Sequence, residues 1–235
     1  MHKKLMLLMK RNKFSTFFSA LLLGISALGW QACSQNSTEK SELPYLGERQ
    51  LVQRNDNGQQ VTDTLYHRIP DFAFINQDSQ VVTSLTVQDK VYVTDFFFTT
   101  CPTICPKMKS QMLRIYEAFE DDPRVMLLSH TIDPKHDTVA VLRDYADRLQ
   151  VNSNKWQFVT GEKDSIYSIA LQYMVSAMED EEEPGGFVHS GAFVLVDQNR
   201  HVRGIYDGTD PAQVDRLIRD IPTLLPKKKK DADKN

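Results

Sequence analysis

Two cysteines and one histidine are the residues of this chain whose types and spacing best suit metal binding or redox chemistry. Cys101 and Cys105 are separated by three residues and follow a strongly apolar run, while His189 lies far downstream and directly ahead of another apolar run. Thiolate sulfur and imidazole nitrogen suit soft metal ions such as Cu(I), and three such ligands leave a site open enough to release the ion. The same thiols could instead exchange with disulfides. The residues alone therefore predict either a copper site or a redox-active dithiol.

The segments around the cysteines predict how the two thiols are positioned. Residues 91–98 are a continuous β-branched and aromatic run, as expected of a central strand that is covered on both faces. Residues 108–119 follow with helical spacing of apolar side chains. If the helix begins inside the cysteine loop, both sulfurs lie on its first turn, where the positive end of the helix dipole favours thiolates. His189 is expected on a loop at the mouth of a strand, after the acidic run 179–183.

The remaining pattern alternates strands with helices and predicts an α/β, thioredoxin-like fold with a central mixed sheet flanked by helices. An N-terminal hairpin is expected over 72–83, and a C-terminal antiparallel hairpin over 191–206 precedes a helix over 211–221. Other strands are expected at 63–69, 124–129 and 156–159, and other helices at 138–149 and at 164–171, the last capped by Asp164 or Ser165.

The N-terminus carries an export signal. Five cations precede the apolar stretch 14–28, and a small residue stands before Cys33. This order resembles a bacterial lipoprotein signal in which Cys33 becomes lipidated after cleavage; an uncleaved membrane anchor or an ordinary signal peptide beside a chance cysteine are the alternatives. The lipoprotein interpretation predicts an extracytoplasmic protein, held on the periplasmic side of a bacterial membrane.

Four segments are expected along the chain: a signal peptide over 1–32, a flexible tether over 33–42, a thioredoxin-like copper-binding domain over 43–225 and a disordered basic tail over 226–235. The 235-residue chain has a net charge of −3, and removal of the five cations of the signal leaves −8. Such an acidic protein is a poor nucleic-acid binder.

Other interpretations of the cysteines and of a nearby acid remain open. A structural zinc site requires four ligands, and the remaining candidate is Asp133, which could equally cap the turn that follows it. Asp133 could also orient the metal ligands without touching the metal. A structural disulfide between Cys101 and Cys105 would close only a very short loop, which stabilises a fold little.

Three motifs together resemble the SCO/SenC family of copper-binding cytochrome c oxidase assembly proteins. They are residues 97–106, residues 131–138 and residues 188–190, in the family's order and within 43–225. The resemblance implies a thioredoxin-like fold, copper held by Cys101, Cys105 and His189, and delivery of copper or reducing equivalents to the CuA site of cytochrome c oxidase. The chain departs from the family pattern at Val188, where an aspartate is common, and in lacking a glycine near Phe98.

The two functional hypotheses differ in what the thiols do. In the first, the protein is a membrane-tethered metallochaperone rather than an enzyme, and its partners are the CuA-bearing subunit or another copper client and a thiol reductant. In the second, it is a thiol-disulfide oxidoreductase with Cys101 as nucleophile and Cys105 as resolving thiol. The extra residue between the cysteines, compared with the C-x-x-C of thioredoxins, favours copper.

Overall fold

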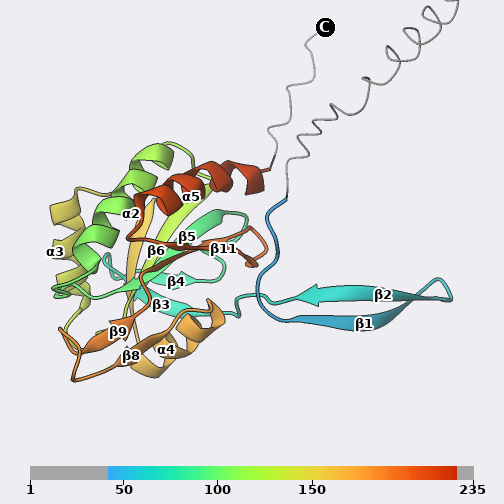
Figure 1. Ribbon diagram of the computed structural model, residues 1–235, viewed down its shortest axis with the longest axis horizontal. Coiled ribbons are helices and arrows are strands. Elements are labelled where there is room, and N and C mark those ends of the chain that lie inside the picture. The colour runs from blue at the N-terminus through green and yellow to red at the C-terminus, as the bar shows by residue number, and fades with distance from the viewer. Residues whose placement is uncertain (1–41, 227–235) are drawn as a thin grey trace, which may run out of the picture. The chain divides into compact units, whose positions relative to one another are not determined.

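A seven-stranded mixed sheet forms the centre of the molecule. The computed structural model describes residues 42–226, and Figure 1 shows the sheet with helices on both of its faces. The strand order is β11-β10-β5-β6-β7-β3-β4. Its strands are β3 (Ala73–Asn76), β4 (Val81–Thr83), β5 (Val91–Phe97), β6 (Val125–Thr131), β7 (Trp156–Thr160), β10 (Ala192–Val196) and β11 (Val202–Asp207). The thioredoxin-like α/β fold predicted from the sequence is confirmed, as is the antiparallel β10–β11 hairpin.

The three central strands β5, β6 and β7 are parallel and fully buried. Parallel strands need crossover connections, and these are the helices α2 (Cys105–Phe119) and α3 (Val139–Leu149). The antiparallel pairs β10–β5 and β7–β3 extend the sheet on either side. Strand β5 lies between β10 and β6, away from the two outer strands of the sheet. The loop that follows β5 carries the cysteines, so it lies near the middle of the sheet edge that is formed by the carboxyl ends of the parallel strands.

Helices α2, α3 and α5 (Pro211–Leu224) cover one face of the sheet, and α4 (Lys163–Gln172) covers the other (Figure 1). Met108 of α2 and Tyr145 of α3 line one small void together with Phe97 of β5, which places both helices on the same face. On the opposite face, Tyr173 at the end of α4 packs against Phe96. Alternate residues of β5 therefore face different helical layers. The prediction that Asp164 or Ser165 caps α4 is wrong: the N-cap is Glu162, and no side chain bonds there.

A further hairpin precedes the sheet, in addition to β3–β4 and β10–β11, and only its second strand was expected from the sequence, over 63–69. Strands β1 (Arg49–Asp56) and β2 (Gln59–Tyr66) pair along their whole length, and nearly all of their residues are exposed. Asn57 and Gly58 both have positive φ, as the favoured two-residue hairpin turn requires. At the base of the hairpin, Tyr66 stacks on Tyr45 with ring centroids 4.1 Å apart.

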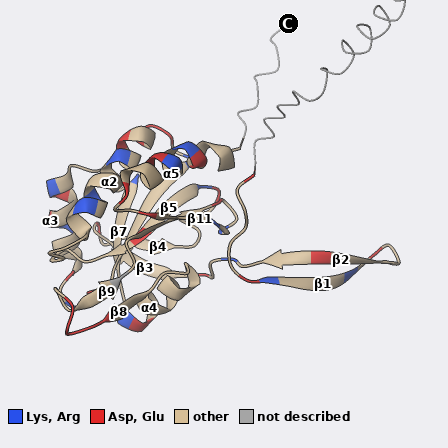
Figure 2. Cartoon of the chain, viewed as in Figure 1, with Lys and Arg blue, Asp and Glu red and all other residues tan. Residues whose placement is uncertain are grey.

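A short two-stranded sheet of β8 (Ala177–Glu179) and β9 (Phe187–His189) encloses the acidic run (Figure 2). Only a loop was expected there from the sequence, because three-residue strands are too short to show periodicity. No helix among the described residues is long and apolar enough to cross a membrane. The predicted signal peptide, lipidation at Cys33, most of the tether and the tail beyond Pro226 lie outside the described residues.

Candidate metal centre

The cysteine loop begins where β5 ends, at the centre of the sheet edge. The backbone N–H of Cys101 donates to the Phe98 carbonyl at 3.3 Å, and its sulfur lies 3.6 Å from Thr103 Oγ1. Helix α2 begins at Cys105, so Cys105 lies at the helix start and Cys101 lies in the loop ahead of it. The expectation that both sulfurs share the first helical turn is therefore wrong in detail. Neither cysteine is in a disulfide, and both are buried.

The two thiols differ in how easily they ionise. Burial opposes ionisation of Cys101, but hydrogen bonds from Cys105 and Thr103 outweigh it and lower the pKa of the Cys101 thiol. Burial raises the pKa of Cys105 well above its ordinary value, and donation of its hydrogen bond to Cys101 raises it further. Cys101 is thus the thiol that supplies a thiolate first, as ligand or as nucleophile.

His189 is the last residue of strand β9, where it pairs with Ala177. Residues before and after His189 in the sequence lie close to the cysteine loop. Ahead of it, Gly185 has φ +96°, and a Cβ added there would lie 3.1 Å from the Pro102 ring. After it, a Cβ on Gly191 would lie 3.6 Å from Ile104. The segment that carries His189 therefore runs beside the residues between the two cysteines.

Aromatic packing supports the same juxtaposition. The Phe187 ring, two residues before His189, lies 5.0 Å from the Phe98 ring at the start of the cysteine loop. The structure describes His189 through its backbone, and among the described side chains no group of three His, Cys, Asp or Glu is gathered as a metal site. The fold thus brings the segments of the three predicted ligands together.

Asp133 lies in the turn after β6, where its carboxylate accepts a hydrogen bond from His136 N at 3.3 Å. This contact is the turn-capping role that the sequence analysis left open for it. The acid that reaches the cysteine loop is Asp137, which accepts from Thr99 N at 3.0 Å and from Thr131 Oγ1 at 2.6 Å. Sequence reasoning missed Asp137 because an aspartate just before a helix looks like a helix-start residue.

A second missed acid lies beneath the loop. Asp95, in the middle of β5, accepts a hydrogen bond from Ser129 Oγ at 2.5 Å, and Ser129 in turn accepts from Trp156 Nε1 at 2.9 Å. Burial raises the pKa of Asp95 to about 7, against the lowering effect of the Ser129 hydrogen bond. Asp95 and Cys105 line the same small void. The only sequence signal was a single carboxyl group inside an apolar run.

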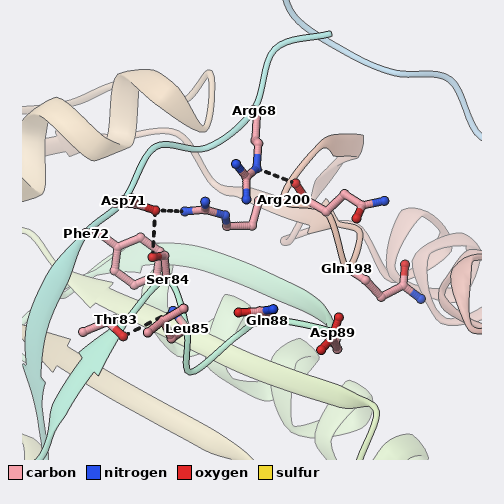
Figure 3. Close-up of a pocket in the computed structure, with 11 residues that line it drawn as sticks. Arg68, Asp71, Phe72, Thr83, Ser84, Leu85, Gln88, Asp89, Gln198 and Arg200 are labelled. Carbon is pink, nitrogen blue, oxygen red and sulfur yellow. Dashed lines mark hydrogen bonds and ion pairs between the residues drawn. The ribbon is translucent and has the colours of Figure 1, made fainter. Parts of the chain in front are cut away.

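A cavity of about 560 Å³ lies elsewhere, among residues that precede β3 and residues of the β4–β5 and β10–β11 connections (Figure 3). Because Val196 at the end of β10 pairs with Tyr92 near the start of β5, this cavity lies at the sheet edge opposite the cysteines. Its buried cation Arg200 is already bonded to Asp71 at 2.6 Å. The residues that line the cavity include no sulfur ligand, so the cavity does not suit a soft metal ion.

Comparison with known proteins identifies the family of this chain. The family model described as SCO1/SenC matches residues 60–225, which is more than half of the chain. The chain belongs to the SCO1/SenC family. The match covers β2 to α5 and includes both cysteines and His189.

Two curated relatives show how far the similarity extends. The "SCO1 protein homolog" of Bacillus subtilis (strain 168) is 30% identical over 166 residues, which are 70% of this chain and 86% of the relative. A protein of Stutzerimonas stutzeri named "Putative copper-binding protein" is 26% identical over 161 residues, which are 67% of this chain and 76% of that protein.

Two solved structures confirm the fold. The crystal structure of a SCO1/SenC family lipoprotein from Bacillus anthracis str. Ames has a TM-score of 0.61 at 29% identity, covering 67% of this chain and 94% of that one. A structure of BsSco, described by its disulfide switch and as a member of the Sco family of cytochrome c oxidase assembly proteins, has a TM-score of 0.61 at 28% identity. It covers 72% of this chain and 100% of its own.

Proposed function

We propose that this protein is a copper chaperone that binds one copper ion through Cys101, Cys105 and His189 and delivers it to the CuA site of a cytochrome oxidase. The observation that carries the proposal is that the segment of His189 runs beside a loop with two buried cysteines that form no disulfide. Two sulfurs and an imidazole form a donor set suited to Cu(I). Copper is the cargo here, so the protein acts as a carrier rather than as an enzyme.

The relatives support both halves of this proposal. One relative is named for copper binding, and the BsSco structure is described within a family of cytochrome c oxidase assembly proteins. The client is accordingly a CuA-bearing oxidase subunit, or another protein whose copper site is filled outside the cytoplasm. A thiol reductant is the second partner, because a disulfide between Cys101 and Cys105 leaves no thiolate for the metal.

The environment of the thiols suits capture followed by release. The lowered pKa of Cys101 favours its thiolate form as a ligand, and Cys105 gives up its proton when the metal replaces it. All three ligands belong to a loop or to element ends, so a client ligand can enter as a protein ligand leaves. A metal held only by such segments exchanges more easily than one enclosed by rigid strands.

Attachment to a membrane is the third part of the proposal. The basic start, the apolar stretch and Cys33 support a lipid anchor on the periplasmic side, and a similar solved protein is described as a lipoprotein. In the Cys33→Ser variant, the protein should appear in an unprocessed or soluble form instead of the processed form in the membrane fraction. Incorporation of labelled palmitate should be abolished. Undiminished palmitate incorporation in that variant would contradict the anchor.

An anaerobic copper titration tests the central proposal. The full-length reduced protein in detergent should bind one Cu(I) with protection of both thiols from alkylation, and His189→Ala should weaken Cu(II) binding sharply. His201→Ala is the matched control, because that imidazole bonds to the His67 carbonyl at the other end of the sheet. Equal Cu(II) affinity in the His189→Ala and wild-type proteins would contradict the assigned ligand.

A thiol-disulfide oxidoreductase is the second candidate, favoured by the unequal ionisation of the two thiols. The Cys101 thiolate would attack a client disulfide and release one client thiolate. Cys105 would then lose its proton and attack Cys101, which forms the internal disulfide and releases the second client thiol. Cys105→Ser should trap the mixed disulfide between Cys101 and the client, whereas Cys101→Ser should trap none. Absence of any trapped adduct with an oxidised CuA-type dithiol would exclude this activity.

A further inference from the structure

The carboxylate of Asp137 joins three segments of the chain. It accepts hydrogen bonds from Thr99 N at 3.0 Å and from Thr99 Oγ1 at 2.5 Å, both at the start of the cysteine loop. It also accepts from Thr131 Oγ1 at 2.6 Å, at the end of β6, and lies 3.0 Å from His136 Nδ1. The Asp137 side chain has no exposed surface. A buried carboxylate is tolerated only when its oxygens are satisfied in this way, and such charge-assisted bonds are strong.

The turn that carries Asp137 is itself fixed. Asp137 N donates to the Asp133 carbonyl at 2.8 Å, and Asp133 N donates to Thr131 Oγ1 at 3.1 Å. Ile132 N continues the β5–β6 ladder by donating to the Phe97 carbonyl at 2.8 Å. The carboxylate is therefore held by the rigid end of the parallel sheet. It is a fixed point against which the cysteine loop is positioned.

The cysteine loop lies between two anchors. Cys105 is held by α2, whose first residue it is, and the chain leaves β5 through Thr99, two residues before Cys101. Because α2 fixes one sulfur, the path of the chain from Thr99 decides where the other sulfur lies. Both bonds that Thr99 makes to Asp137 act on this path.

We propose that Asp137 is a positioning residue that sets the placement of Cys101 relative to Cys105. It thereby stabilises the dithiol arrangement over the disulfide and tunes copper affinity without touching the metal. The copper part rests on the proposed function, whereas the dithiol part requires only the two thiols. The proposal requires that closing the disulfide moves Cys101 and breaks the Thr99–Asp137 bonds seen in the dithiol form, so losing these bonds should destabilise the dithiol form selectively.

The two threonines offer a matched pair of variants. Thr99→Val and Thr131→Val each remove a hydroxyl that donates to the same carboxylate, and valine has nearly the shape of threonine. Only Thr99 belongs to the cysteine loop. A purely structural role of Asp137 predicts similar effects of both variants, whereas a positioning role predicts an effect on the thiols from the Thr99 side alone. Thr99→Ser keeps the hydroxyl and serves as the rescue variant.

The test is the equilibrium of the full-length protein in detergent with oxidised and reduced dithiothreitol, followed by thiol counting. In this reaction the Cys101 and Cys105 thiols lose two electrons and two protons to the dithiothreitol disulfide, which becomes a dithiol. We expect Asp137→Asn to shift the equilibrium about tenfold toward the protein disulfide and Thr99→Val about fivefold, in line with the loss of one charge-assisted hydrogen bond. Thr131→Val should shift it less than about twofold, and Thr99→Ser should behave as wild type.

Urea unfolding shows whether each variant is folded. If Asp137→Asn does not fold, the dithiol equilibrium of Thr99→Val tests the proposal instead. A Thr99→Val equilibrium within twofold of wild type, a shift toward the dithiol, or an equal shift in Thr131→Val would overturn the proposal. Cu(I) competition with a chelator is measured on the same proteins. If wild type binds no copper, the proposed function fails, but the dithiol equilibria still judge the role of Asp137.

Discussion

Each face of the central sheet buries a titratable group, and burial shifts the pKa values of the two groups in opposite directions. On the face covered by α2 and α3, Asp95 is hydrogen-bonded to Ser129, and burial raises its pKa to about 7. On the face covered by α4, His130 stacks on Phe96 with ring centroids 4.9 Å apart, and burial lowers its pKa to about 3. Only the first face shares a void with Cys105. The void places Cys105 beside the layer of the core under α2 and α3, so we expect the dithiol to respond more to changes in that layer than to changes in the other.

The opposite shifts give opposite dependences of stability on pH. Between about pH 4 and 7, the folded protein keeps a proton on Asp95 that the unfolded chain releases, so the free energy of unfolding falls as pH rises through this range. Between about pH 3 and 6.5, the unfolded chain binds a proton on His130 that the folded protein excludes, so stability rises with pH.

The largest effect is expected from a cavity on the α4 face. Phe96→Ala should lower the free energy of unfolding by about 3–5 kcal/mol, as is usual for a buried phenylalanine. The alkylation rate of Cys101 should remain that of wild type under native conditions. Urea unfolding and iodoacetamide kinetics measure the two quantities. Phe97→Ala, on the other face, should cost similar stability and also change the alkylation rate; a changed rate in Phe96→Ala would contradict the separation of the faces.

Removing the buried acid should stabilise the protein above neutral pH. Asp95→Asn cannot ionise, so at pH 8 it should be more stable than wild type by on the order of 3 kcal/mol. The gain should shrink toward zero near pH 3, where both folded and unfolded wild type are largely protonated at this position. Urea unfolding at the two pH values measures the difference, with the exposed Asp144→Asn as control. A gain that is the same at both pH values would argue against burial of an ionisable group as its cause.

The histidine on the opposite face should show the reverse trend. Wild type should lose roughly 2 kcal/mol of stability through His130 between pH 6.5 and 4.5, and His130→Phe should not show this loss. The slope of unfolding free energy against pH is the quantity to compare, because it is independent of any packing cost of the substitution. An unchanged slope in His130→Phe would show that His130 is not the acid-sensitive group.

The smallest effect concerns the Cys101 thiol. Thr103→Val removes a hydrogen bond that helps lower the pKa of Cys101, so the pH at which alkylation reaches half its maximal rate should rise. Thr103→Ser should keep the wild-type profile. If the half-maximal pH falls in Thr103→Val, the hydroxyl does not stabilise the thiolate.

Long apolar patterns made most of the fold predictable. The apolar run over 91–98 predicted β5, and the helical spacing over 108–119 predicted α2, so the elements around the cysteines were expected. Three separated motifs indicated the family. Strands β8 and β9 were missed because three residues show no period, and β1 was missed because its residues are polar and alternate weakly.

The cysteines and the histidine of the candidate site could be predicted from the sequence, whereas the nearby buried acids could not. Cys101, Cys105 and His189 stand out by residue type and spacing, whether or not each of them binds copper. Asp95 and Asp137 became visible only through tertiary contacts, since Ser129 and Thr99 lie more than thirty residues from them in sequence. Hydrogen bonds between distant segments leave no local pattern in the chain.

The β1–β2 hairpin has a practical consequence for labelling the protein. Its Asn57-Gly58 turn lies at an exposed tip, and almost none of its side chains belong to the core. Exposed turns of this kind are the places where chains best tolerate added sequence. A fluorophore or an affinity tag inserted between Asn57 and Gly58 would therefore report on the protein while leaving the cysteine edge of the sheet unaltered.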